Sequence, residues 1–316
     1  MKDLLSLKDA SSEFVNDVID KAIEIKANPE NYKEMLKDKT LMMIFEKPSL
    51  RTRVSFEVGM TQLGGHAIYY DVSTSPLGRK ETIEDTAKTS ERYVDIIMAR
   101  LNHFSDCKAL ADNAKVPVID ALSDMNHPCQ ILCDLQTIKE KFGNLKGLTL
   151  AYVGDSENNV TYSLMHGCAH VGINVRVGCP DDPEHKPKQE IVEEAKAVAK
   201  AYADKNGTEP TTIEVFHNAA EAVKDADVVY TDSWMSYHIP VDRMEIRKQK
   251  LMPFQVTTEL MGNAKSTAVF MNCLPAMRGL EQTAEVVDGP QSIVFDQAEN
   301  RLHAQKALML KLLGKI

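Results

Sequence analysis

The sequence predicts an α/β fold with parallel sheets flanked by helices. Short apolar runs rich in valine and isoleucine alternate with segments of helical periodicity along the chain. Such runs are typical of parallel strands, because crossover helices cover both faces of their sheet. The 316 residues, of which 43% are hydrophobic, are enough for two domains with separate cores. We therefore expect two α/β domains in one chain.

Ten segments are expected to form strands, because each is short, apolar and followed by a turn or a polar cluster. In order they are LMMIF (41–45), HAIYYD (66–71), DIIMAR (95–100), VPVID (116–120), LTLAYVG (148–154), INVRVG (173–178), TIEVFH (212–217), DVVYTD (227–232), AVFMNCLP (268–275) and SIVFD (292–296). Helical periodicity is clearest at 52–64, 82–94, 129–143, 189–205, 218–226 and 297–314.

A domain boundary is expected at FGNLKG, residues 142–147. A long helical segment ends there with glycine and asparagine, and a new series of strands and helices begins. The expected domains are 1–142 and 143–296, followed by a terminal helix over 297–316 that would pack back on the first domain.

Composition narrows the class of protein. The net charge of −9 argues against a nucleic-acid or anionic membrane partner, since both select for basic surfaces. The six cysteines form no C-x-x-C pair, which favours free thiols in a reducing cytosol. The charged N-terminus does not resemble a signal peptide, and no apolar run approaches the ~20 residues of a membrane helix. We expect a soluble, cytoplasmic protein.

The segment EKPSLRTRVSF (46–56) places hydrogen-bonding side chains between a strand and a helix. Backbone N–H groups and the dipole at a helix N-terminus favour an anion, and an arginine fork matches two phosphate oxygens. Ser49 could equally be a helix cap, and Arg51 and Arg53 could form surface ion pairs. The segment by itself leaves both interpretations open.

Other polar groups follow the later strands. Arg100 ends DIIMAR, and HPCQ (127–130) offers two donors that suit a carbonyl oxygen, although it could also be a capping turn. In the second half, similar positions hold asparagines, an acid, a serine and a cysteine: Asn158, Asn159, Asp232, Ser236 and Cys273 with Leu274. The carboxyl ends of parallel strands share one edge of a sheet, so we expect these groups to converge on a ligand.

With these residues the chain resembles the aspartate/ornithine carbamoyltransferase family, closest to its ornithine branch. F-x-K-P-S-x-R-T-R, H-P-C-Q, D-x-x-x-S, C-L-P-A-x-R-G and A-E-N-R-x-x-x-Q-K occur in the family's order and spacing over nearly the full length. The resemblance implies an active site in the cleft between two α/β domains, and a homotrimer or multiple of trimers. The implied reaction converts ornithine and carbamoyl phosphate to citrulline and phosphate, without a metal or organic cofactor.

The resemblance also implies roles for individual residues. Arg51, His127, Gln130 and Cys273 would be catalytic, the first three by stabilising the tetrahedral oxyanion. The implied carbamoyl phosphate site comprises Ser49, Leu50, Arg51, Thr52, Arg100, His127, Gln130, Cys273, Leu274 and Arg301. The implied ornithine site comprises Asn159, Asp232, Ser236 and Tyr237.

Several positions depart from the family pattern and leave alternatives open. Tyr237-His238 stands where the ornithine branch usually has Met-Gly, Pro76 replaces a glutamine, and Asn272 replaces a histidine. Another amine, putrescine or an N-acylated ornithine, is therefore an alternative substrate. A non-catalytic anion-binding protein is a second alternative. A zinc site from His166 and His170 is a third, but it lacks the intervening glutamate and a nearby third ligand.

Overall fold

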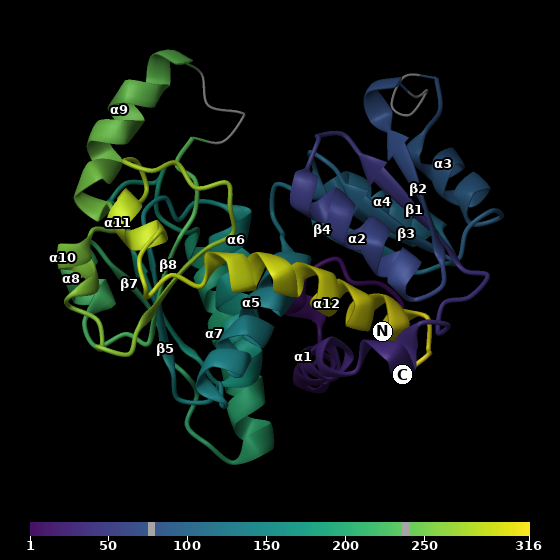
Figure 1. Ribbon diagram of the computed structural model, residues 1–316. Coiled ribbons are helices and arrows are strands. Elements are labelled where there is room, and N and C mark those ends of the chain that lie inside the picture. Colours follow the sequence, from purple (N-terminus) through teal and green to yellow (C-terminus); the bar gives the residue numbers. More distant parts are fainter. Residues whose placement is uncertain (75–79, 236–240) are drawn as a thin grey trace. The chain divides into compact units, whose positions relative to one another are not determined.

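The structure, a computed structural model, describes residues 1–74, 80–235 and 241–316. The chain forms two compact units, each with its own sheet (Figure 1). The first comprises Met1–Lys141 together with Glu299–Ile316, and the second comprises Phe142–Ala298.

The first unit contains a four-stranded parallel sheet in the order β2-β1-β3-β4. Its strands are β1 (Thr40–Phe45), β2 (His66–Asp71), β3 (Ile96–Arg100) and β4 (Val118–Leu122). Its helices are α1 (Ser12–Ala27), α2 (Leu50–Gln62), α3 (Ile83–Ser90), α4 (Phe104–Asn113), α5 (Pro128–Phe142) and most of α12 (Val294–Leu312), with 3-10 turns η1 (Leu7–Asp9), η2 (Pro29–Tyr32) and η3 (Val72–Thr74).

The second unit contains a five-stranded parallel sheet in the order β7-β6-β5-β8-β9. Its strands are β5 (Thr149–Val153), β6 (Asn174–Gly178), β7 (Ile213–Phe216), β8 (Val228–Thr231) and β9 (Val269–Asn272). Its helices are α6 (Asn159–Val171), α7 (Gln189–Asn206), α8 (Ala219–Val223), α9 (Val241–Leu251), α10 (Thr258–Met261) and α11 (Ala284–Val287), with the 3-10 turn η4 (Met252–Phe254).

The burial of the strands explains why the sequence forms parallel sheets. All the residues of β8 and β9 are buried, and so are most residues of β1 and β3. Strands covered on both faces form nearly continuous apolar runs, as these segments do apart from their polar end residues. The edge strand β2 has only half-buried and exposed residues. The α/β class with two parallel sheets is therefore confirmed.

The strand orders define where ligands are expected in each unit. In the first sheet the chain passes from β1 to β2 on one side and returns to β3 on the other, so the order reverses between β1 and β3. In the second sheet the reversal lies between β5 and β8. Ligands of open α/β sheets bind at the carboxyl ends of the strands beside such a reversal.

The prediction that SIVFD (292–296) forms a strand was wrong. Ser292 forms a single bridge to Phe270, and the chain enters α12 at Val294. Two backbone hydrogen bonds join Phe270 to Gln291 and Ile293, so the pairing with β9 ends after one bridge. A short run of valine, isoleucine and phenylalanine suits a strand and the first turn of a buried helix equally well.

Other differences are shifts of element boundaries. The strand expected over 116–120 is displaced to Val118–Leu122, and α2 begins at Leu50 rather than at Thr52 because Ser49 caps it. Among the helices in the described parts of the chain, none is long and apolar enough to cross a membrane.

Candidate active site

The residues Ser49 to Thr52 form the N-terminus of α2, directly after β1. The Ser49 side chain caps the helix by accepting a hydrogen bond from the Thr52 N–H at 3.3 Å. The Leu50 side chain is 74% exposed and apolar, so only its backbone N–H can serve an anion. The segment thus combines the two interpretations from the sequence, because a capped helix still presents N–H groups at its first turn.

Thr52 joins two arginines from distant parts of the first unit. Its buried hydroxyl oxygen accepts from Arg100 Nη1 at 3.3 Å and from Arg301 Nη2 at 3.2 Å. Arg100 ends β3, whereas Arg301 lies on α12. The structure therefore brings the end of β3, the first turn of α2 and α12 to one place at the carboxyl end of the sheet.

Positive charge surrounds His127 at this place. His127 is buried, and its pKa lies well below the ordinary value, first because of burial and then because of the charges of Arg301, Arg100 and Arg51. The imidazole is therefore neutral near neutral pH and can donate one hydrogen bond without carrying charge. The pKa of Lys47 is lowered first by burial and then by the positive charge of Arg100.

Gln130 supports Arg301 rather than pointing into open space. Its Oε1 accepts from Arg301 Nη1 at 2.7 Å, and its Nε2 donates to Asp134 Oδ1 at 2.9 Å. Gln130 and Asp134 are both fully buried. The amide is fixed in this orientation, since its oxygen must face the guanidinium and its nitrogen the carboxylate. In this state Gln130 orients Arg301.

In the second unit, Asn158 and Asn159 have different surroundings. Asn158 is the N-cap of α6: its Oδ1 accepts from Thr161 N–H at 2.9 Å, and its Nδ2 donates to the Asp155 carbonyl and to the Tyr152 hydroxyl. The polar atoms of the Asn158 side chain are thus used in the cap, and Asn159 is the first helical residue. The choice of Asn159 for the ornithine site stays a prediction.

Asp232 and Cys273 lie in contact. The Cys273 thiol donates to Asp232 Oδ1 at 3.0 Å, which joins the ends of the adjacent strands β8 and β9. Cys273 is half-buried, whereas the other five cysteines are buried. The next residue, Leu274, has a φ of 56°, in the left-handed region that non-glycine residues rarely adopt.

Arg247 on α9 binds two segments near Asp232. Its Nε donates to the Trp234 carbonyl at 2.7 Å, and its Nη2 pairs with the buried carboxylate of Asp155. Burial raises the pKa of Asp155 to about 7, and the charge of Arg247 opposes that rise. Sequence reasoning missed this arginine, because nothing in the local pattern of α9 indicates a partner 92 residues earlier.

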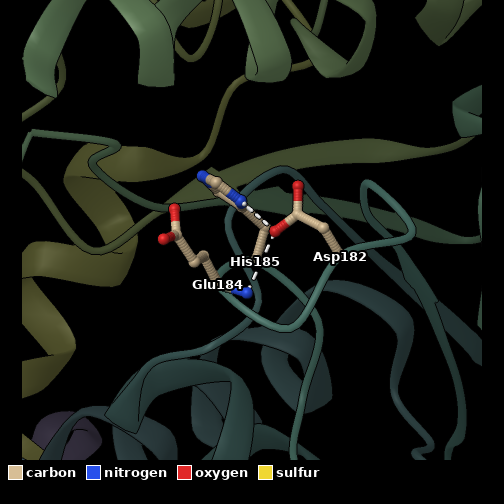
Figure 2. A group of neighbouring side chains, drawn as sticks. All are labelled: Asp182, Glu184 and His185. Atoms are coloured by element: carbon tan, nitrogen blue, oxygen red, sulfur yellow. Dashed lines mark hydrogen bonds and ion pairs between the residues drawn. The ribbon is translucent and has the colours of Figure 1, made fainter.

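A group of potential metal ligands in the second unit is already paired with basic residues. Asp182, Glu184 and His185 lie close together in the loop before α7 (Figure 2). His185 Nδ1 lies 2.7 Å from Asp182, and its Nε2 lies 3.2 Å from Arg247 Nη1. Lys250 is 3.3 Å from Asp182. These contacts use the ligand atoms and surround them with positive charge, so the group is better explained as the attachment of α9 to this loop.

His166 and His170 do not belong to any such group within the residues that the structure describes. Both are buried on α6, and His166 Nε2 lies 3.6 Å from Glu194 on α7. The sequence-based choices Ser236 and Tyr237, together with Pro76 and His238, lie outside the described residues.

Comparison with known proteins identifies the family. A family model described as the carbamoyl-P binding domain of aspartate/ornithine carbamoyltransferase matches residues 2–140. A second model, described as the Asp/Orn binding domain of the same family, matches residues 146–312. The chain belongs to the aspartate/ornithine carbamoyltransferase family. Arg51, Arg100 and His127 lie within the residues matched by the carbamoyl-P binding model. Arg301 and the Asp232–Cys273 pair lie within those matched by the Asp/Orn binding model.

Members of the ornithine branch are similar over their whole length. The ornithine carbamoyltransferase of Methanothermobacter thermautotrophicus is 50% identical over 316 residues, which cover 100% of both chains. That of Thermococcus kodakarensis is 48% identical, covering 100% of this chain and 97% of the relative. The solved structure of ornithine carbamoyltransferase from Pyrococcus furiosus has a TM-score of 0.92 and 45% identity, covering 100% of this chain and 98% of that one.

Proposed function

We propose that the chain transfers the carbamoyl group of carbamoyl phosphate to the δ-amine of ornithine, giving citrulline and phosphate. The observation that carries the proposal is the cluster of Arg51, Arg100 and Arg301 around the neutral His127 at the N-terminus of α2. The full-length similarity to proteins named ornithine carbamoyltransferase supports the choice of amine.

The phosphate group would bind at the first turn of α2. Backbone N–H groups of this turn and the guanidinium of Arg51 would hold its oxygens, while Arg100 adds positive charge. Phosphate leaves with additional negative charge, so the same groups stabilise the transition state more than the ground state. In this proposal Thr52 acts through the arginines, because its hydroxyl oxygen accepts from two of them.

The carbamoyl oxygen would be bound by His127 and Arg51. A neutral imidazole donates one hydrogen bond, and the nearby guanidinium stabilises the negative charge that develops as the amine attacks. Removal of one such donor commonly lowers kcat by ~10²–10³. Gln130 contributes by keeping Arg301 in place.

The amine would bind through the ends of β8 and β9. The carboxylate of Asp232 suits the α-ammonium group of ornithine, and Asn159 and Ser236 would complete this half of the site. The δ-amine must lose its proton before it attacks, and an alkylamine of this kind has a pKa of about 10.4. Positive charge and exclusion of water would favour that loss. Cys273 would be a proton acceptor or a residue that orients the amine.

The proposal is tested by a comparison of amines under one set of conditions. Purified protein with carbamoyl phosphate is given ornithine, putrescine, N-acetylornithine or aspartate, and the carbamoylated product is measured. Ornithine is expected to give the highest kcat/KM by at least tenfold. The inactive control is Arg51→Ala, whose fold is checked by circular dichroism. A preference for any other amine would contradict the proposal, and a lack of activity with all four would favour an anion-binding protein.

We also propose that the chain assembles as a homotrimer, or as a multiple of trimers. The support is an exposed apolar stripe on α2, formed by Leu50, Val54 and Val58 at helical spacing. Ile68, on the neighbouring edge strand β2, is also exposed. For localisation we propose the cytoplasm, because all six cysteines are free thiols and a reducing compartment preserves them.

A further inference from the structure

Asn272, the last residue of β9, forms three hydrogen bonds, through its backbone N–H, its side-chain nitrogen and its side-chain oxygen. Its backbone N–H donates to Gln297 Oε1 at 3.0 Å, and its Nδ2 donates to Gln282 Oε1 at 3.1 Å. Its Oδ1 accepts from the Leu274 N–H at 2.7 Å. Asn272, Gln282 and Gln297 are all fully buried. The orientation of the amide is unambiguous, because only its oxygen can accept from a backbone N–H.

The bond to Leu274 closes a turn over Cys273. An asparagine side chain that accepts from the backbone N–H two residues later forms an Asx turn. The turn holds Leu274 at a φ of 56°, which is unfavourable for a residue with a Cβ. The Asn272 acceptor therefore helps to hold Leu274 in this conformation, and we expect the turn and Cys273 to shift when the acceptor is removed.

The two buried glutamines fix the position of Asn272 itself. Gln297 also donates to the Tyr230 hydroxyl at 3.1 Å, which connects Asn272 to β8. Gln282 follows the loop that contains Cys273, and its carbonyl accepts from Gly279 N–H at 2.8 Å. Gln297 and Gln282 therefore fix the backbone and the side-chain nitrogen of Asn272, and the side-chain oxygen binds the Leu274 N–H.

We propose that Asn272 is a positioning residue, which holds the Cys273–Leu274 turn so that the thiol lies against Asp232. The inference deepens the proposed function and rests on it, since Cys273 and Asp232 belong to the proposed amine half of the site. Because Asn272 is fully buried, it would act through the turn.

The test compares Asn272→Ala with Asn272→Asp. Alanine removes the acceptor, whereas aspartate keeps it and can close the same turn. We expect Asn272→Ala to lower kcat/KM for ornithine about tenfold and to raise the rate of Cys273 alkylation by iodoacetamide at least threefold, because the thiol leaves the carboxylate. Binding of inorganic phosphate should be unchanged, because the proposed phosphate groups lie in the first unit. Asn272→Asp should recover at least half of each change on a logarithmic scale.

The matched control is Gln291→Ala. It removes a side-chain hydrogen bond, 2.9 Å long, to the Ala268 carbonyl beside the start of β9, away from the turn. Its alkylation rate should equal that of the unchanged protein. The proposal is overturned if Asn272→Ala folds and its Cys273 is alkylated at the unchanged rate. It is also overturned if Asn272→Asp changes kcat/KM and the alkylation rate as much as Asn272→Ala does, or if Gln291→Ala raises the alkylation rate equally.

A second variant covers a failure of Asn272→Ala to fold. Gln282→Met leaves Asn272 in place but removes the acceptor that anchors its amide. A faster alkylation of Cys273 is expected, and an unchanged rate overturns the proposal. The alkylation rates test Asn272 whichever amine is the substrate, whereas the amine comparison alone tests the proposed function.

Discussion

At the residue scale, Asp120 is a carboxyl group whose pKa is raised by burial. It lies in β4, is fully buried, and its Oδ2 accepts from the Ser123 hydroxyl at 2.7 Å. The buried Cys107 thiol also forms a hydrogen bond with this carboxyl group. Burial is the largest cause that raises the pKa of Asp120 to about 8. The folded chain therefore binds this proton more tightly than the unfolded chain does.

This difference predicts a pH-dependent effect of Asp120→Asn. Below about pH 4 the carboxyl is protonated in both states, so it favours neither. As the pH rises towards 8, the unfolded chain releases the proton and the folded chain keeps it, so stability falls. An asparagine has no proton to release, so Asp120→Asn avoids this loss. The free energy of unfolding of the variant minus that of the unchanged protein should therefore rise by ~3 kcal/mol between pH 5 and pH 8.

Urea unfolding at the two pH values measures the effect. The control is Asp112→Asn, which removes an exposed carboxyl on α4 paired with Lys108 and is measured at the same two pH values. A relative stability of Asp120→Asn that does not change with pH would contradict a raised pKa.

Also at the residue scale, the local sequence pattern identified polar residues at the ends of strands but not the residues with which they form hydrogen bonds. Arg100 ends a predicted strand, and Thr52 and His127 follow two others, so their common location was predictable. The bond from Arg301 to Gln130 joins residues 171 apart in the sequence, and that of Arg247 to Asp155 joins residues 92 apart. Only the folded chain decides such contacts, because each side chain has many possible partners in the sequence.

At the element scale, the start of α6 depends on Asn158. The side chain caps the helix and also donates to the Asp155 carbonyl at 2.6 Å and to the buried Tyr152 hydroxyl at 3.1 Å. A helix cap is worth ~1 kcal/mol, and unpaired buried groups cost a further ~1–3 kcal/mol. The cap therefore also orders the loop before Asn159.

Asn158→Ala is accordingly predicted to destabilise the protein by ~2–3 kcal/mol. The comparison is Asn218→Ala, which removes an exposed cap of the short helix α8, where the side chain accepts from the Ala220 and Glu221 N–H groups. That variant should cost ~1 kcal/mol or less. Both values are obtained from urea unfolding at one pH, and equal losses would show that the contacts to Tyr152 and Asp155 contribute nothing.

The element scale also shows where sequence periodicity fails. The buried strands of both sheets were predictable, since a strand covered on both faces forms a nearly continuous apolar run. The run SIVFD has the same character, but its residues from Val294 begin α12. Hydrophobicity alone could not distinguish the two, because both place these side chains in a core.

At the scale of the whole molecule, the exposed stripe on α2 predicts self-association. Val54 is 47% exposed and Val58 36% exposed, although both are apolar and lie one turn apart. A charge at Val54 would have to be desolvated in any interface that covers this stripe. Val54→Glu should therefore shift the sedimenting species from a trimer, or a multiple of trimers, towards the monomer.

The control for this prediction is Ile246→Glu. Ile246 is 61% exposed on α9 and apolar, but it lies in the second unit. Its sedimentation should match that of the unchanged protein. A monomeric unchanged protein would contradict the proposed trimer, and an unaltered assembly of Val54→Glu would exclude the α2 stripe from the interface.

The α/β class, nine of the strands and the family could be predicted from the sequence, because apolar runs and polar strand ends are local features. The pairing of polar atoms became known with the folded chain. The fold placed Gln130 behind Arg301, used Asn158 as a cap, and closed the Cys273 turn with Asn272. These contacts depend on burial, because buried polar groups require hydrogen-bond partners. Several of the partners are far apart in the sequence, so a local sequence pattern does not indicate them.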